Sequence, residues 1–153
     1  MNTLHLYTDG SCLKNGQEEA RAGWAAILSY GEKQLHLSGK IELEKPTNNV
    51  AELTAVVKGI EAIKPDAKCA VVIRCDSEYV VKSINEKRVH SWAKTGWMTS
   101  TKKPVANVEL WKKLIAVCRE RKGCTFTFED VAAHSGDVYN ELCDKLAKKA
   151  ASM

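Results

Sequence analysis

The sequence has 153 residues, a formal net charge of +4, 44% hydrophobic residues and 27% charged residues. This balance is ordinary for a soluble protein, and a chain of this length buries enough surface to form one domain without disulfides. No apolar run approaches the roughly 18 residues of a membrane span, so we expect no membrane partner. The first residues, MNTLHLYTDG, lack the basic and apolar stretches of a secretory signal, and we expect a cytoplasmic protein.

Three strands are predicted in the first part of the chain. Apolar residues recur with strand-like spacing in 4–10, 23–30 and 33–43, and YGEK is typical of a hairpin between the second and third strands. The Asp-Gly pair at Asp9 and Gly10 predicts a turn that ends the first strand. On this interpretation the strand ends on a carboxylate at the rim of a sheet.

A helix follows, and then a strand. Thr47, Asn48 or Asn49 caps the helix, whose apolar residues have helical spacing until Pro65 ends it. CAVVIRCDS is a nearly continuous apolar run, which predicts a strand covered on both faces that ends on Asp76.

The second half alternates helices and strands. A short helix over 77–84 begins at Asp76 or Ser77, a long amphipathic helix is ended by Gly123, CTFTFEDV is a strand, and Asp137 caps the last helix. A meander followed by alternating helices and strands predicts an α/β fold with a mixed sheet and helices packed on its faces.

The cysteines argue against a zinc site, and the basic residues indicate the kind of partner that the protein binds. The six cysteines include no C-x-x-C pair and lie mostly in apolar stretches, which favours buried free thiols over a zinc site. Between Lys82 and Lys113 the chain has eight Lys or Arg and two acids. This basic segment indicates a polyanionic partner. With no sign of an oligomer in the exposed charge, we expect a monomer.

Acidic residues follow two of the predicted strands. The carboxyl ends of neighbouring parallel strands meet, so Asp9 and Asp76 can lie side by side, although each also suits a turn or a cap. Glu52 lies at the edge of the inward stripe of its helix, in a first turn where the helix dipole favours a carboxylate.

Asp144 completes the set. Asp144 lies four residues after Asn140 on the last predicted helix. The small side chains of Ala147 and Ala151 on the same helix face would let that face pack closely on the rest of the protein and bring Asp144 with it. A solvent-exposed aspartate is an equal alternative. Clustered carboxylates repel one another unless a cation lies between them. Oxygen ligands suit Mg²⁺ or Mn²⁺, and a pair of such ions serves phosphodiester hydrolysis.

The chain contains four motifs in this order: YTDGSC, TNNVAEL, CDSEYV and HSGDVYNELCDKLA. Together they resemble the signature of type 1 ribonuclease H, and the resemblance extends from about Leu4 to Ala151. WAKTGWMTSTKKPVANVELW resembles the basic protrusion of that family. The resemblance implies a single ribonuclease H domain over 1–153, with a protrusion at about 86–106. It also implies a ribonuclease H-like sheet of five strands, three antiparallel and two parallel, with helices on both faces.

The resemblance also implies the chemistry. The protein is expected to be an endonuclease that hydrolyses the RNA strand of RNA–DNA hybrids and leaves 5′-phosphate and 3′-hydroxyl ends. Two Mg²⁺ ions, with Mn²⁺ as a possible substitute, are expected on the four acids Asp9, Glu52, Asp76 and Asp144. His134 matches the family's histidine that assists proton transfer or product release, where the alternative is an exposed loop residue without a role.

Substrate contacts follow by similarity. The expected contacts to the RNA strand are Cys12, Asn15, Asn48, Glu52 and Glu78, and those to the DNA strand are Thr47, Asn48, Lys87 or Arg88, Trp92, Lys102 and Lys103. Asn49 and Asn140 complete the set. The alternatives are helix capping for Thr47, Asn48 and Asn49, and a solvated charged face for the basic residues. Trp97 and Trp111 are expected mainly in the core.

One loop departs from the family pattern, and the sequence disfavours two other functions. The loop LKNGQEEARAG contains Glu18 and Glu19, which we expect to point away from phosphate. A binding module for hybrids or double-stranded RNA without catalysis conflicts with the presence of all four acids. A polymerase-attached or transposase-like nuclease of the same fold conflicts with the absence of a second domain in 153 residues.

Overall fold

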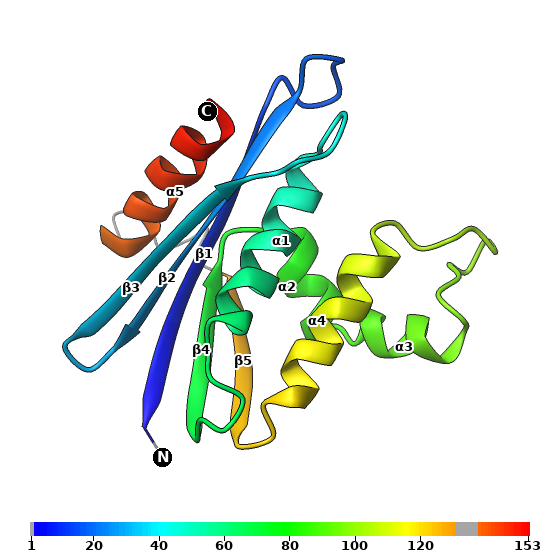
Figure 1. The fold of residues 1–153 in the computed structure, drawn as a ribbon. Helices are drawn as coiled ribbons and strands as arrows, with labels where there is room; N and C mark the ends of the chain where they lie inside the picture. The colour runs from blue at the N-terminus through cyan, green and yellow to red at the C-terminus, as the bar shows by residue number, and fades with distance from the viewer. Residues whose placement is uncertain (1, 131–137) are drawn as a thin grey trace.

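The computed structural model describes residues 2–130 and 138–153 and contains a sheet of order β3-β2-β1-β4-β5 (Figure 1). The antiparallel strands are β1 (Thr3–Leu13), β2 (Arg21–Tyr30) and β3 (Lys33–Lys40). The two strands β4 (Cys69–Cys75) and β5 (Cys124–Asp130) continue the sheet in parallel from β1. The predicted mixed sheet is confirmed.

Helices cover both faces of this sheet, as predicted (Figure 1). One face carries α1 (Asn48–Glu61), α2 (Glu78–Asn85), α3 (Arg88–Lys94) and α4 (Val108–Glu120), and the other carries α5 (Val138–Ala151). Successive side chains of a strand point to opposite faces, so central β1 packs against both layers. Leu6 belongs to the main core below α1, and Tyr7 belongs to a second cluster below α5.

The first strand does not end at Asp9. β1 stays paired with β2 as far as Leu13 and Arg21, whereas its pairing with β4 stops at Thr8 and Cys75. The predicted turn is wrong because β2 supports the strand past the Asp-Gly pair. Asp9 and Asp76 are therefore the first residues beyond the shared β1–β4 ladder, at the point where the two strands separate.

Gly10 serves close packing rather than a turn. It is absent from the positions with positive φ, and a Cβ there would lie 2.5 Å from the Ala51 carbonyl carbon and 2.5 Å from the Glu52 nitrogen. Gly23 on β2 has the same role toward α5, because its Cβ would come within 3 Å of Ala147 and Ala151. The predicted approach of α5 through these two small residues is confirmed.

Helix termini resolve several sequence alternatives. Thr47 caps α1, with its Oγ1 accepting from the Val50 nitrogen at 3.2 Å, and Ser77 caps α2 in the same way at 3.3 Å. Asp76 is thereby left free of a capping role. Glu52 is five residues after the Thr47 cap, so its predicted place in the first turn of α1 is wrong.

The end of α4 also differs from the prediction. The helix ends at Glu120 rather than at Gly123, and Arg121 follows as its C-cap. The buried Arg121 guanidinium donates to the carbonyl oxygens of Ile63 and Val117 at 2.8 Å and of Glu61 at 3.1 Å. Its charge satisfies carbonyl groups at the ends of two helices, which favours a cation there.

β4 is fully covered on one face only, so the predicted cover on both faces is wrong. Its residues alternate between buried and half-buried, because α5 packs on β1, β2 and β3 while Ala70, Val72 and Arg74 lie beyond it. The continuous apolar sequence of this strand therefore predicted more burial than the structure shows.

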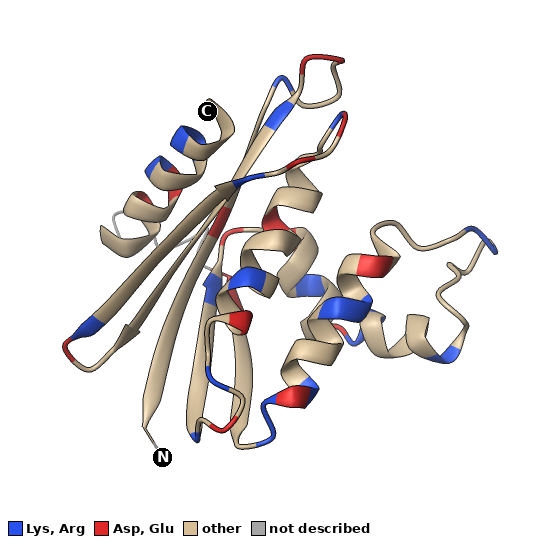
Figure 2. Cartoon of the chain, in the orientation of Figure 1, with Lys and Arg blue, Asp and Glu red and all other residues tan. Residues whose placement is uncertain are grey.

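The basic segment extends from the body as α3 and the loop that follows it (Figure 1). Figure 2 shows Lys and Arg on α3, at the tip of this loop and on α4. Val89 and Val105 are buried at its base beside Trp111, which is fully buried as predicted. Trp97 is half-buried and packs against the main core, so it lies at the core's edge rather than inside it.

All six cysteines are free thiols, of which Cys69, Cys75 and Cys143 are buried and the others half-buried. Within residues 2–130 and 138–153, no helix is long and apolar enough to cross a membrane.

The close packing at Gly10 gives the first prediction. Gly10→Ala forces α1 away from β1 and is expected to lower the free energy of unfolding by about 3 kcal/mol, measured by urea denaturation. Gly31→Ala is the matched control, because Gly31 has a φ of +61° and open space around its Cβ position. We expect that control to cost about 1 kcal/mol. Equal effects of the two substitutions would contradict the packing role.

Candidate active site

The structure brings the four predicted acids together from four elements. Asp9 on β1 forms side-chain hydrogen bonds with Asp76, which follows β4, and with Asp144 on α5. Glu52 on α1 lies close enough for its charge to interact with those of the other three. The acids meet where β1 leaves β4, between the α1 layer and the α5 layer.

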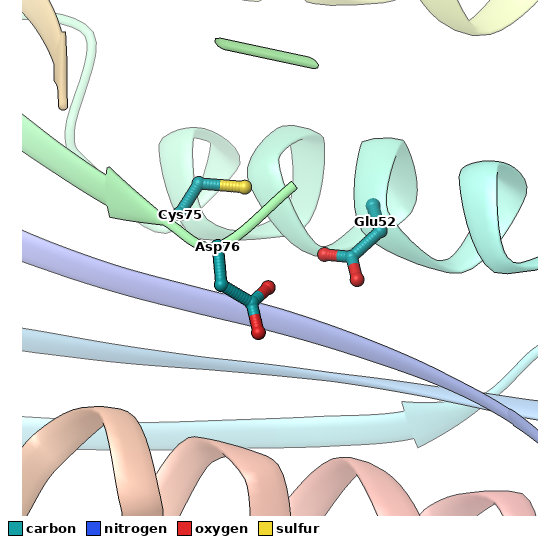
Figure 3. A group of neighbouring side chains, drawn as sticks. All are labelled: Glu52, Cys75 and Asp76. Atoms are coloured by element: carbon teal, nitrogen blue, oxygen red, sulfur yellow. The ribbon is translucent and has the colours of Figure 1, made fainter. Parts of the chain in front are cut away.

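Figure 3 shows how two of these side chains approach each other. Glu52 reaches down from α1, and Asp76 extends from the end of β4 across the ribbon of β1, while the Cys75 side chain points away from the Asp76 carboxyl group. Glu52, Cys75 and Asp76 each present a ligand atom within 4.8 Å of the others. Two carboxylates and a thiol therefore border the same small volume.

Burial and mutual repulsion disfavour the charged form of this cluster. Burial, followed by the charges of Asp76 and Asp144, raises the pKa of Asp9 to about 8. Burial, followed by the charges of Asp76 and Asp9, raises the pKa of Glu52 to about 10, although the Gly10 N–H opposes part of this shift. Burial also raises the pKa of Asp76, against a hydrogen bond from Asp9 that lowers it. Without a cation, the cluster holds protons at neutral pH.

The donor atoms fit a hard divalent cation. The Oε2 atom of Glu52 is buried and has no hydrogen-bond partner among the described residues, so it is open to a cation. Burial, followed by the charge of Glu52, raises the pKa of the Cys75 thiol, and a protonated thiol is a poor ligand. The carboxylates then supply an oxygen-only set, which suits Mg²⁺ or Mn²⁺ rather than zinc.

Two charged residues at this site were missed in the sequence. Lys148 Nζ lies 2.9 Å from Asp144 Oδ2, and this hydrogen bond raises the pKa of Lys148. Asp130 ends β5 opposite Cys75, and its charge contributes to the raised pKa of Asp76. The signals were present, since Lys148 is four residues after Asp144 and Asp130 ends a strand as Asp76 nearly does.

The predicted RNA-strand residues gather beside the acids, where the end of β1 meets the start of α1. Cys12 Sγ donates to the Pro46 carbonyl at 3.3 Å, and the Asn48 backbone nitrogen donates to Asn15 Oδ1 at 3.2 Å. Asn49 is exposed next to Asn48. These contacts join two segments distant in the sequence into one surface, about one helical turn from Glu52.

Two further predicted substrate contacts lie on other helices: Glu78, expected at the RNA strand, and Asn140, which was assigned to neither strand. Glu78 is exposed in the first turn of α2 and pairs with Lys82 at 3.6 Å. Asn140 is half-buried on α5, one turn before Asp144. Glu18, in the acidic loop between β1 and β2, pairs with Lys45 at 3.3 Å on the exposed surface.

The predicted DNA-strand residues lie on α3 and its loop, apart from Thr47 and Asn48 at α1. Lys87, Lys102 and Lys103 are exposed there, and Arg88 pairs with Glu86 at 3.3 Å. The half-buried Trp92 packs on Trp111 with 5.9 Å between ring centroids. His134 lies outside the described residues.

The family comparison agrees with this geometry. The family model described as RNase H matches residues 1–152, nearly the whole chain. The chain belongs to the RNase H family. Ribonuclease H of Clostridium botulinum strain Hall is 38% identical over 150 residues, which cover 98% of this chain and 96% of the relative. Ribonuclease H of Erwinia tasmaniensis is 40% identical over 151 residues, covering 99% and 90%.

Solved structures have the same fold. LC9-RNase H1, a type 1 RNase H with the type 2 active-site motif, matches with a TM-score of 0.80 and 25% identity over 99% of this chain and 72% of the other. LC11-RNase H1 in complex with RNA/DNA hybrid matches with a TM-score of 0.69 and 21% identity over 97% of this chain and 96% of the other. The predicted ribonuclease H-like fold is confirmed.

The repulsion among the acids gives a pH-dependent prediction. The pKa of an exposed aspartate is 3.8, whereas the pKa of Asp9 in the folded protein is about 8. The folded protein therefore keeps a proton that the unfolded chain has lost. The contribution of Asp9 to the free energy of unfolding is full below about pH 4 and is lost as the pH rises through 8. Asp9→Asn removes this loss and keeps a hydrogen-bond donor. In metal-free urea denaturation it is expected to stabilise the protein by about 2 kcal/mol at pH 7.5, with a smaller gain below pH 4.

Asp66→Asn is the control, because Asp66 is an exposed acid on the loop before β4. It is expected to change the free energy of unfolding by less than about 0.5 kcal/mol at either pH. An Asp9→Asn protein that is less stable than the wild type at pH 7.5 would contradict the repulsion.

Proposed function

We propose that this chain is a metal-dependent endoribonuclease that hydrolyses the RNA strand of RNA–DNA hybrids and leaves 5′-phosphate and 3′-hydroxyl ends. One observation carries the proposal. The carboxylates of Asp9, Glu52, Asp76 and Asp144 converge where β1 leaves β4, in a chain that the RNase H model matches over residues 1–152. The relatives that match nearly end to end bear the name Ribonuclease H.

The four acids are the proposed ligands of two Mg²⁺ ions, with Mn²⁺ as a substitute. When bound, such ions activate a water molecule for attack on the phosphate and stabilise the leaving oxygen. The orphaned Oε2 of Glu52 and the raised pKa values of Asp9 and Glu52 support this assignment, since a cation would offset the repulsion among the acids.

The chain's own groups hold the ligands and move protons. Gly10 and Gly23 bring α1 and α5 onto the sheet and so fix where Glu52 and Asp144 point. Lys148 holds one oxygen of Asp144 at 2.9 Å. His134 is proposed, from the family resemblance, to assist proton transfer or product release, a role that histidine suits because its ordinary pKa is near neutral.

Two surfaces are proposed to read the hybrid. Hydroxyl groups at the 2′ position distinguish an RNA strand from a DNA strand. We assign hydrogen bonds with these 2′-hydroxyl groups to residues at the start of α1 and beside it, together with one residue each from α2 and α5. They are Cys12, Asn15, Asn48, Asn49, Glu52, Glu78 and Asn140. The DNA-strand phosphates are assigned to the residues on or near the protrusion: Thr47, Asn48, Lys87, Arg88, Trp92, Lys102 and Lys103.

We further propose one RNase H domain over residues 1–153, with a basic protrusion at about 86–106, acting as a cytoplasmic monomer. The hydrophobic clusters below α1 and below α5 both include residues of β1, so the two layers are built on one strand and support a single domain. Six free thiols suit a reducing compartment.

Cleavage of defined substrates tests the proposed activity. With Mg²⁺, an end-labelled RNA–DNA hybrid is expected to be cut, while RNA duplex, DNA duplex and single strands stay intact. Asp76→Asn is expected to lower the rate at least about 100-fold because it removes a ligand charge, while Asp66→Asn keeps wild-type activity and circular dichroism checks both folds. Hybrid binding without metal-dependent cutting would instead indicate a binding module, and near-native activity of Asp76→Asn would contradict the site.

Salt dependence tests the protrusion. In the inactive Asp76→Asn background, Lys102→Gln/Lys103→Gln is expected to weaken hybrid binding and to reduce the slope of log affinity against log salt by about 1 to 2, since each phosphate contact adds about 0.9. Lys64→Gln/Lys68→Gln is the matched control, because both lysines are exposed on the loop before β4. An unchanged slope in the first variant would show that its lysines form only a solvated face.

A further inference from the structure

Two cysteines face each other at the edge of the sheet opposite β3. Cys69 and Cys124 are register partners at the first paired position of β4 and β5, and their Sγ atoms are 3.7 Å apart. Neighbouring strands lie about 4.8 Å apart. That separation is within the roughly 4.4–6.8 Å between Cα atoms that a disulfide accommodates. The backbone already places this pair for a bond.

The two thiols differ in access. Cys69 is 4% exposed, whereas Cys124 is half-buried on β5, which pairs with β4 alone and forms an edge of the sheet. Cys124 Sγ donates a weak hydrogen bond to the Ala67 carbonyl oxygen at 3.5 Å. Cys118 on α4 is near enough to interact electrostatically with Cys124 and is the competing partner.

We propose that Cys69 and Cys124 form a reversible intrachain disulfide when the folded protein meets a small-molecule disulfide such as oxidised glutathione. The Cys124 thiolate attacks one sulfur of the oxidant, which forms a mixed disulfide and releases one glutathione thiolate. The Cys69 thiolate then attacks the Cys124 sulfur, forms the intrachain bond and releases the second glutathione. The two cysteines lose two electrons, the oxidant gains them, and the two thiol protons end on the two glutathiones.

The position of the pair determines what the bond does. It lies at the amino ends of β4 and β5, whereas Asp76 follows the carboxyl end of β4, about 20 Å away at 3.3 Å per residue. The bond closes a loop that contains α2, α3, α4 and the basic segment. Closing so long a loop restricts the unfolded chain, so oxidation should stabilise the protein and leave the acid cluster unchanged. This inference does not depend on the proposed function.

The test is oxidation of the folded protein with glutathione buffers, followed by intact mass and peptide mapping. We expect a loss of about 2 Da and a Cys69–Cys124 peptide. The thermal midpoint should rise by about 10 °C, and dithiothreitol should reverse it. Cys118→Ser should behave like the wild type, whereas Cys69→Ser and Cys124→Ser should each lose both effects while their reduced forms keep the wild-type circular dichroism.

Three results would overturn the proposal. They are glutathione adducts without an intrachain bond, a Cys118–Cys124 peptide in place of the expected one, and an oxidised wild type whose thermal midpoint equals that of the reduced protein. Mapping of the wild type decides the first two, so the conclusion does not depend on whether a variant folds.

Discussion

Repulsion among four carboxylates is the constraint on which the rest of this structure depends. Asp9, Glu52, Asp76 and Asp144 come from four elements, and burial adds to the cost of charging Asp9, Glu52 and Asp76. A fold that gathers such groups must offset their repulsion by packing elsewhere. Here two cores share central β1 and pack on either side of the acids, while Lys148 pairs with Asp144 at the exposed edge.

Glycines bring the acids together. Gly10 lets β1 touch the backbone of α1 at Ala51 and Glu52, and Gly23 lets β2 touch α5. Without these contacts each helix would stand off by the width of a side chain, and its acid would lie farther from Asp9. The same close packing that stabilises the layers therefore positions the ligands, which couples the stability of the protein to its site.

Sequence periodicity predicted the elements well and their local roles less well. The strands, the mixed sheet and the approach of α5 through Ala147 and Ala151 follow from apolar spacing and residue size. The Asp-Gly pair suggested a turn because local propensity cannot show that β2 continues to support β1. Lys148 was missed although it stands four residues after Asp144, whereas the effect of Asp130 on Asp76 depends on the pairing of β5 with β4.

Metal binding should release protons, and this is the most direct test of the central claim. At pH 7, calorimetric titration of the protein with Mg²⁺ or Mn²⁺ in buffers of different ionisation enthalpy gives the number of protons released. Because Asp9 and Glu52 have pKa values of about 8 and about 10 without metal, we expect release of about one proton or more. Asp9→Asn should reduce that number. Metal binding with no proton release at pH 7 would contradict the account.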